Sequence, residues 1–141
     1  MIVDASVILR AFFPDEAQVN AQALVRDHVA GRVQLKAPTL LPYELGNAVL
    51  KAERRGRIGS DQSVQIIDTL RGLNIEIFPL EWGEMLPQAR RFQCSAYDAA
   101  YLVLAEQLSE PLVIGDERLY NAVHGHLDWV LWIEDYPAQP D

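Results

Sequence analysis

Cysteine is almost missing from this sequence, which has 141 residues and one cysteine, Cys94. A single cysteine excludes an intramolecular disulfide and a cysteine-based zinc cage, and it fits the reducing environment of the cytoplasm. Long apolar runs are missing too, since no stretch approaches the roughly 20 residues of a membrane span. Residues 1–4 show neither the basic nor the apolar segment of a secretory signal. We therefore expect a cytoplasmic protein with no membrane association.

Positive charge is also scarce in this chain. It has 12 Lys and Arg residues against 20 Asp and Glu residues, which gives a formal net charge of −8. Because proteins that bind nucleic acid are usually basic, this balance argues against such a partner. The objection weakens if a metal ion neutralises some of the acids, or if a basic partner chain binds.

The overall composition is typical of a globular domain, with 50% hydrophobic and 23% charged residues. No linker, internal repeat or low-complexity tract divides the chain. We therefore expect one domain over residues 1–136, followed by a loose, proline-containing tail at residues 137–141.

Short apolar segments alternate with longer segments of helical character along the chain. The segments typical of strands are residues 2–3, 33–37, 75–78, 111–114 and 129–133. The segments typical of helices are residues 7–12, 16–30, 42–55, 60–72, 82–92, 95–108 and 117–123, with Asp15 as the expected cap of the second. Strands separated by helices predict an α/β fold, a three-layer α/β/α sandwich around a mainly parallel, five-stranded sheet. In such folds the functional site lies beyond the carboxyl ends of the strands.

Two acidic residues stand where predicted strands end. Asp4 directly follows the apolar pair Ile2–Val3, and Asp116 follows the apolar segment Leu112–Ile114 and one glycine. On parallel strands these two positions are equivalent, so we expect both carboxylates at the same edge of the sheet.

Two further acids lie on the apolar faces of predicted helices. Glu44 shares its stripe with Leu41, Leu45 and Ala48. Asp98 shares a stripe with Cys94, Tyr101, Leu102 and Ala105. Both acids lie in the first turn of their helix, and these turns face the carboxyl edge of the sheet if the crossovers are regular.

Helix capping is the alternative explanation for all four acids. Asp4 and Asp116 each precede a helix, and Ser95–Asp98 resembles a capping box. Capping does not explain an acid on a buried stripe, where a lone carboxylate costs on the order of several kcal/mol unless it is paired or bound to metal. We therefore expect the four carboxylates to share one site.

Carboxylates that converge repel one another, and a divalent cation relieves this repulsion. All-oxygen ligands favour Mg²⁺ or Mn²⁺ over zinc or copper. Such an ion can bridge a scissile phosphate and lower the pKa of an attacking water. The sequence therefore predicts a metal site suited to cleavage of a phosphodiester.

Four blocks occur in a fixed order along the chain: Val3–Ser6, Leu41–Ala48, Tyr97–Leu102 and Leu112–Leu119. Together they resemble the PIN domain family, in particular the VapC-type toxin ribonucleases of toxin–antitoxin pairs. The resemblance implies a Mg²⁺- or Mn²⁺-dependent endoribonuclease that forms a homodimer, with RNA as substrate and a cognate antitoxin as protein partner. It also implies a catalytic, metal-binding quartet at Asp4, Glu44, Asp98 and Asp116.

For several neighbours of the quartet, we expect roles that the sequence supports less strongly. Ser6 matches a polar residue that often supports the first aspartate of the family, and Glu117 is either a supporting acid or a solvated residue of a helix start. Arg10 and Arg118 are candidates for contacting substrate phosphate, with surface ion pairs as the alternative. Ile114 departs from the family pattern, because a Thr or Ser commonly stands there.

Two other functions compete with a nuclease. Ile114 favours a non-catalytic, PIN-like binding module whose metal site is weakened. A phospho-accepting α/β domain fits less well, because position 6 lacks the second aspartate that a haloacid-dehalogenase-type start needs. An apolar groove beside the acidic pocket would suit an antitoxin peptide that places an apolar helix in the groove and a basic residue near the quartet.

Overall fold

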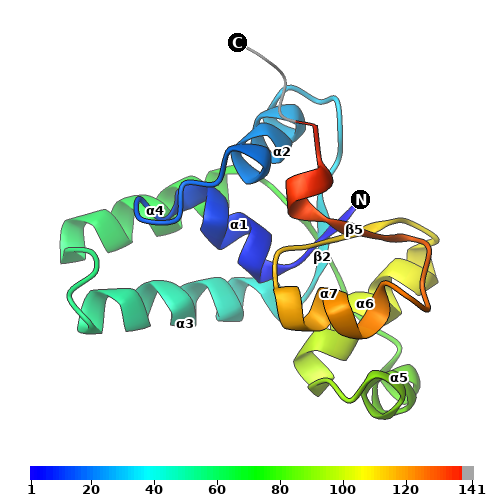
Figure 1. The fold of residues 1–141 in the computed structure, drawn as a ribbon. Coiled ribbons are helices and arrows are strands. Elements are labelled where there is room, and N and C mark those ends of the chain that lie inside the picture. Colours follow the sequence, from blue (N-terminus) through cyan, green and yellow to red (C-terminus); the bar gives the residue numbers. More distant parts are fainter. Residues whose placement is uncertain (138–141) are drawn as a thin grey trace.

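A parallel five-stranded sheet organises the computed structural model, which describes residues 1–137 (Figure 1). The strands are β1 (Ile2–Val3), β2 (Lys36–Pro38), β3 (Glu76–Phe78), β4 (Leu112–Ile114) and β5 (Val130–Trp132). Their order in the sheet is β3-β2-β1-β4-β5, and all neighbours are parallel. The predicted α/β class and five-stranded sheet are confirmed, and the sheet is wholly parallel.

Helices connect every pair of consecutive strands. In residues 1–137 the α-helices are α1 (Ala5–Phe12), α2 (Val19–Val29), α3 (Leu41–Arg54), α4 (Ser60–Gly72), α5 (Met85–Phe92), α6 (Ala96–Leu108) and α7 (Glu117–Val123). Two short 3-10 helices, η1 (Trp82–Glu84) and η2 (Ile133–Asp135), complete these residues. Helices α3 and α4 form a long hairpin that extends away from the sheet (Figure 1).

Two apolar cores lie on opposite faces of the sheet, because successive strand residues point to opposite sides. Val3 and Val113 pack into one core with residues of α1, α2, α3 and α4. Ile2, Leu112 and Ile114 pack into the other core with residues of α5, α6 and α7. The three layers of the sandwich follow from this alternation.

Three predicted boundaries differ from the structure. The strand expected from residue 33 begins at Lys36, and the helix expected over residues 82–92 begins with the 3-10 turn η1. The expected cap at Asp15 is wrong, because the side chain of Gln18 accepts the Ala21 amide hydrogen at 2.7 Å and begins α2. Asp15 instead forms an ion pair with Arg57 at 2.8 Å, a contact between distant parts of the sequence.

None of the helices in residues 1–137 combines the length and the apolar character that crossing a membrane requires. The predicted tail at residues 137–141 lies outside the described residues, apart from Pro137.

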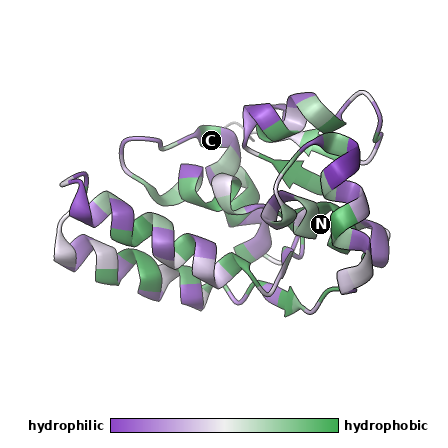
Figure 2. Ribbon diagram, turned by 90° about the horizontal axis from the view of Figure 1, so that it is seen from below, coloured by the Kyte–Doolittle hydropathy of each residue, from purple (hydrophilic) through white to green (hydrophobic). Residues whose placement is uncertain are grey.

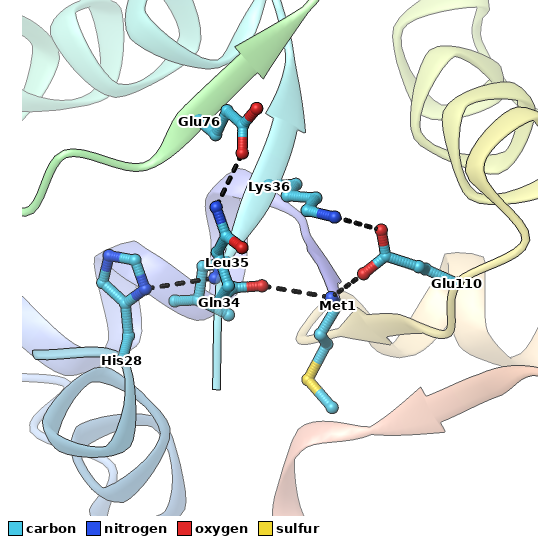
Figure 3. A network of polar contacts seen from close by, with 7 residues as sticks. All are labelled: Met1, His28, Gln34, Leu35, Lys36, Glu76 and Glu110. Atoms are coloured by element: carbon cyan, nitrogen blue, oxygen red, sulfur yellow. Dashed lines mark hydrogen bonds and ion pairs between the residues drawn. The ribbon is translucent and has the colours of Figure 1, made fainter. Parts of the chain in front are cut away.

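Polar contacts join the amino ends of the strands, at the edge opposite the predicted site (Figure 3). The Glu110 carboxylate, just before β4, binds the Met1 amino group through Oε1 and the Lys36 ammonium through Oε2, each at 2.5 Å. The Met1 amino group also donates to the Gln34 carbonyl at 3.1 Å, and the Gln34 amide donates to Glu76 at 2.7 Å. Four strand starts are therefore connected through one set of contacts.

His28 lies at the same edge and has a structural role (Figure 3). Its Nδ1 accepts from the Leu35 amide at 3.1 Å, and its Nε2 lies 2.7 Å from the Leu73 carbonyl. A neutral ring with its proton on Nε2 satisfies both partners. These contacts explain His28 without a metal ion.

Replacement of Glu110 by Gln should lower stability by about 1 kcal/mol near pH 7, since the ion pairs are partly exposed. Burial opposes ionisation of Glu110, but hydrogen bonds from Lys36 and the Met1 amine outweigh it and lower its pKa. A carboxyl group whose pKa is lower in the folded state than in the unfolded state stabilises the fold above its unfolded-state pKa, which is about 4.3 for Glu. This stabilisation is lost as the pH falls through the folded-state pKa. Thermal melts of wild type and Glu110→Gln should therefore converge at acidic pH, whereas Glu84→Gln, at an exposed residue, should match wild type throughout.

Candidate functional site

Asp4 is the only charged residue among the buried residues of the described chain, with 5% of its surface exposed. It lies directly after β1 and is the N-cap of α1. Its Oδ1 accepts from the Ser6 hydroxyl at 2.6 Å and from the Val7 amide at 3.1 Å. The capping alternative is thus correct for this residue, yet both of these bonds go to the same oxygen.

Asp116 is the corresponding residue after β4. It is the N-cap of α7, and its Oδ1 accepts from the Arg118 amide at 2.9 Å and the Leu119 amide at 3.3 Å. Within residues 1–137, its Oδ2 makes no hydrogen bond to another group. Each strand-end aspartate is therefore held in a helix cap by one of its oxygens, and the second oxygen of Asp116 has no hydrogen-bond donor in residues 1–137.

Glu44 is held by a tyrosine from another helix. The hydroxyl of Tyr101 on α6 donates to Glu44 Oε1 on α3 at 2.5 Å. Tyr101 is buried and Glu44 half-buried. Burial, together with the charges of Glu44 and Asp4, raises the pKa of the Tyr101 hydroxyl, so it stays a donor at any physiological pH. The neutral Tyr101 hydroxyl thus bonds one predicted ligand, Glu44, and lies within electrostatic reach of another, Asp4.

Asp98 lies half-buried in the first turn of α6. The Ser95 hydroxyl caps this helix by accepting the Asp98 amide hydrogen at 3.0 Å. The cap of α6 is therefore Ser95, and Asp98 is half-buried, whereas its apolar stripe predicts a buried position.

The four carboxylates act on one another through their charges. Burial is the main cause that raises the pKa of Asp4 to about 7, and the charge of Asp116 adds to it. Burial likewise raises the pKa of Asp98, again with a contribution from Asp116. Burial and then the charge of Asp98 raise the pKa of Glu44, although the bond from Tyr101 opposes this. Asp116 thus interacts with two of the acids, and Asp98 extends the set to Glu44.

The four carboxylates are neighbours, but they do not surround a single point. In the described part of the chain, no three His, Cys, Asp or Glu side chains are close enough to hold one metal ion as they stand. Glu44, Asp98 and Asp116 are only half-buried, so small rotations of their side chains are open to them.

The donor set fits a hard divalent cation. Every group is a carboxylate oxygen, which suits Mg²⁺ or Mn²⁺. Among residues 1–137, no Lys or Arg forms an ion pair with any of the four acids. The negative charge of this edge is therefore not neutralised by a direct ion pair, and a divalent cation would supply positive charge there.

Gly115 lets two segments meet next to Asp4. A Cβ atom at this position would lie 2.8 Å from Ser6 Oγ, 3.1 Å from the Val7 nitrogen and 3.2 Å from Val7 Cγ2. Gly115 also provides a backbone hydrogen bond that favours the charged form of Asp4. Only glycine fits here while Ser6 keeps its bond to Asp4.

Ile114 fills the position where a hydroxyl was expected. Its side chain is fully buried in the core that α6 and α7 cover. Position 114 therefore offers no hydroxyl to the site, and Ser6 supplies the hydroxyl that contacts Asp4.

The two candidate arginines lie in different surroundings. Arg118 is exposed, and its charge lowers the pKa of Asp98, so it lies within electrostatic reach of the quartet. Arg10 instead pairs with Glu134 at 3.8 Å and lies over the Trp132 ring. Glu117 is exposed and lines a hollow together with Arg10. Arg118 is thus the better candidate for contacting substrate at the quartet.

Two residues of the site were missed by sequence reasoning. Tyr101 was assigned only to the apolar stripe of α6, although a tyrosine hydroxyl on a buried stripe needs a hydrogen-bond partner and could have signalled Glu44. Gly115 belongs to the block Leu112–Leu119, and no local pattern predicts its contact with Ser6.

Comparison with known proteins gives consistent matches over most of the chain. A family model described as PIN domain matches residues 1–124. Ribonuclease VapC9 of Mycobacterium tuberculosis is 31% identical over 119 residues, which cover 84% of this chain and 87% of that protein. Ribonuclease VapC3 of Pyrobaculum aerophilum is 27% identical over 123 residues, which cover 84% and 91%. The crystal structure of PAE2754 from Pyrobaculum aerophilum shares the fold, with a TM-score of 0.69, 24% identity and coverage of 94% and 83%.

Replacement of Gly115 by Ala should destabilise the protein by about 1–3 kcal/mol, because the new methyl group meets backbone and side-chain atoms. Gly46, inside α3, is the matched control, since a Cβ there meets no atom within 4 Å and alanine favours a helix by up to about 1 kcal/mol. Urea unfolding of both variants measures the difference. Equal stability of Gly115→Ala and wild type would contradict the close approach of Gly115 to α1.

Proposed function

The chain belongs to the PIN domain family, and on that premise we propose that it is a divalent-metal-dependent endoribonuclease, the toxin of a type II toxin–antitoxin pair. The observation that carries the proposal is the set of four carboxylates, Asp4, Glu44, Asp98 and Asp116, whose charges act on one another. In residues 1–137, none of the four forms an ion pair with a basic side chain. The names of the relatives support RNA as the substrate.

The chain's own residues prepare this edge for phosphodiester hydrolysis. Asp4 and Asp116 are fixed by their helix caps through one oxygen each, and Tyr101 orients Glu44. Asp98 completes the set from the start of α6. When bound there, Mg²⁺ or Mn²⁺ lowers the pKa of a water molecule and stabilises charge on the phosphate. Arg118 is the proposed contact to substrate phosphate beside the quartet.

A second function, a non-catalytic PIN-like module that binds RNA or protein, is favoured by one observation. Ile114 replaces the hydroxyl-bearing residue of the family with a fully buried apolar side chain. If that hydroxyl were indispensable for positioning water, the quartet would bind metal without cleaving RNA.

Cleavage of a labelled RNA with Mn²⁺ or Mg²⁺ separates these functions. We expect cleavage by wild type, its loss in excess EDTA and its recovery when the metal is restored. Asp98→Asn should lower the rate at least ~100-fold, since even partners that only support a metal ligand cost 10–100-fold. Asp128→Asn, a change of equal charge at an exposed residue, should cleave like wild type.

The same assay has an outcome that excludes the nuclease. Binding of Mn²⁺ without any RNA cleavage by wild type would favour the non-catalytic module. Full activity of Asp98→Asn would contradict the quartet.

We propose the groove between α3, α4 and β3 as the place where the antitoxin binds. The groove has a volume of about 390 Å³ and is lined mostly by apolar residues, namely Leu41, Pro42, Leu45, Ile67, Leu70, Arg71, Asn74, Ile75 and Ile77. Apolar and polar residues alternate along this hairpin (Figure 2). Because Leu41 and Leu45 flank Glu44 on α3, a segment in the groove reaches the edge of the acidic site. A basic residue at that end would complement both the quartet and the net charge of −8.

Replacement of Ile67 by Glu tests this surface, since it puts a charge into the groove. Ile67 is already 38% exposed, so the change leaves the core intact. Co-expression with the proposed antitoxin partner should give a complex for wild type and for the control Val29→Glu, whose valine lies 70% exposed on α2. The Ile67→Glu variant should lose the antitoxin on purification. An unchanged yield of complex would exclude this groove.

The homodimer and the cytoplasmic location that the sequence suggests stay predictions. Exposed apolar side chains at Trp82, Leu86 and Tyr97 are available for contact between two copies.

A further inference from the structure

A hollow of about 300 Å³ lies between α1 and α7, next to the carboxylate quartet. Its lining residues are Arg10, Glu117, Tyr120, Asn121, Trp132 and Glu134. Three of them come from one face of α7, whose first residue follows Asp116 directly. Arg10 lies one helical turn beyond Ser6 on the same face of α1. Through Glu117 and Arg10, the hollow is therefore adjacent to Asp116 and Ser6.

The aromatic wall of the hollow is held in place by several contacts. The Trp132 indole donates from Nε1 to Glu134 Oε2 at 3.1 Å, and the ring of Tyr120 lies 5.4 Å from the Trp132 ring at 42°. The Arg10 guanidinium lies 5.3 Å from the centre of the Trp132 ring. Its Nη1 is 3.8 Å from Glu134 Oε1. Flat rings and a guanidinium are groups on which unstacked nucleobases bind.

The polar groups of the hollow favour a base over a phosphate. Glu117 and Glu134 give it two negative charges, against one positive charge from Arg10. Glu134 is occupied by Trp132 and Arg10. In residues 1–137, the side chains of Glu117 and Asn121 make no hydrogen bond to another group, so their donors and acceptors face solvent. An anionic phosphate would be repelled, whereas a neutral base with N–H donors would be attracted.

We infer that this hollow binds a guanine base of the RNA substrate, in the nucleotide next to the phosphate that is cut. The inference rests on the proposed function for the identity of the substrate. Guanine has two neighbouring N–H donors on one edge, N1–H and the N2 amino group, which a carboxylate such as Glu117 accepts together. It has two acceptors, O6 and N7, on the other edge, which match the donors of Arg10.

The other bases match these groups less completely. Adenine and cytosine each present one amino group beside a ring acceptor, and that acceptor would face the Glu117 carboxylate. Uracil has a single N–H donor between two carbonyl oxygens. Guanine alone offers a pair of donors to Glu117 and a pair of acceptors to Arg10.

Binding of mononucleotides tests the inference without requiring cleavage. NMR spectra of the ¹⁵N-labelled protein in metal-free buffer are recorded with guanosine 5′-monophosphate and, in parallel, with uridine 5′-monophosphate. The guanine nucleotide should shift the Trp132 indole and Asn121 amide signals, while the indoles of Trp82 and Trp129 stay unchanged. Equal shifts with both nucleotides, or no shift at Trp132, would overturn the inference.

The variant Glu117→Gln tests the specific contact. Glutamine keeps the size of the side chain but replaces one acceptor with a donor, which opposes the guanine edge. We expect affinity for guanosine 5′-monophosphate to fall ~10-fold or more, as for the loss of a bidentate contact to a base. Asp128→Asn removes the same charge elsewhere and should bind like wild type. An equal loss in both variants would assign the effect to net charge and overturn the inference.

Sequencing of the products from a random-sequence RNA separates this inference from the proposed function. Wild type should leave guanine at one fixed position beside the cut, and Glu117→Gln should lose that preference. Cleavage without any base preference would overturn the guanine site and leave the nuclease standing. Selective binding of the guanine nucleotide without any cleavage would support the guanine site and overturn the proposed nuclease.

Discussion

Repulsion between carboxylates that share one edge of a parallel sheet is the constraint on which this site depends. Asp4 has the most strongly affected carboxylate, because burial raises its pKa to about 7 and the charge of Asp116 adds a smaller contribution. The groups that contact Asp4 are neutral donors, namely the Ser6 hydroxyl and backbone amides. The protein thus keeps a concentrated negative charge that its own basic residues leave unpaired, which is the property that a divalent cation requires.

The fold meets this constraint through strand order and helix starts. Since β1 and β4 are neighbours in the sheet, their carboxyl ends bring Asp4 and Asp116 together. The first turns of α3 and α6 add Glu44 and Asp98, and the hydroxyl of Tyr101 connects α6 with Glu44. At the opposite edge, ion pairs hold the strand starts together. The amino ends of the strands thus contribute to stability, and the carboxyl ends carry the acidic site.

Much of this arrangement could be predicted from the sequence, because it depends on local patterns. An acid after an apolar strand gave Asp4 and Asp116, and acids on apolar helical stripes gave Glu44 and Asp98. Contacts between distant segments could not be predicted. The approach of Gly115 to Ser6 depends on the packing of α1 against the end of β4, and the wrong cap at Asp15 reflects its pairing with Arg57, 42 residues away. The aromatic hollow likewise joins α1, α7 and the end of β5, which no single motif contains.

Crystals grown with Mn²⁺ test the central claim, that the four carboxylates share one metal site, most directly. Anomalous scattering at the manganese edge locates the ion independently of any assumption about its ligands. The account predicts a peak at the carboxyl edge of the sheet, with oxygens from at least three of Asp4, Glu44, Asp98 and Asp116 at about 2.0–2.2 Å, the range of hard divalent ions with carboxylates. An ion held by fewer than three of them, or a peak elsewhere on the protein alone, would contradict it.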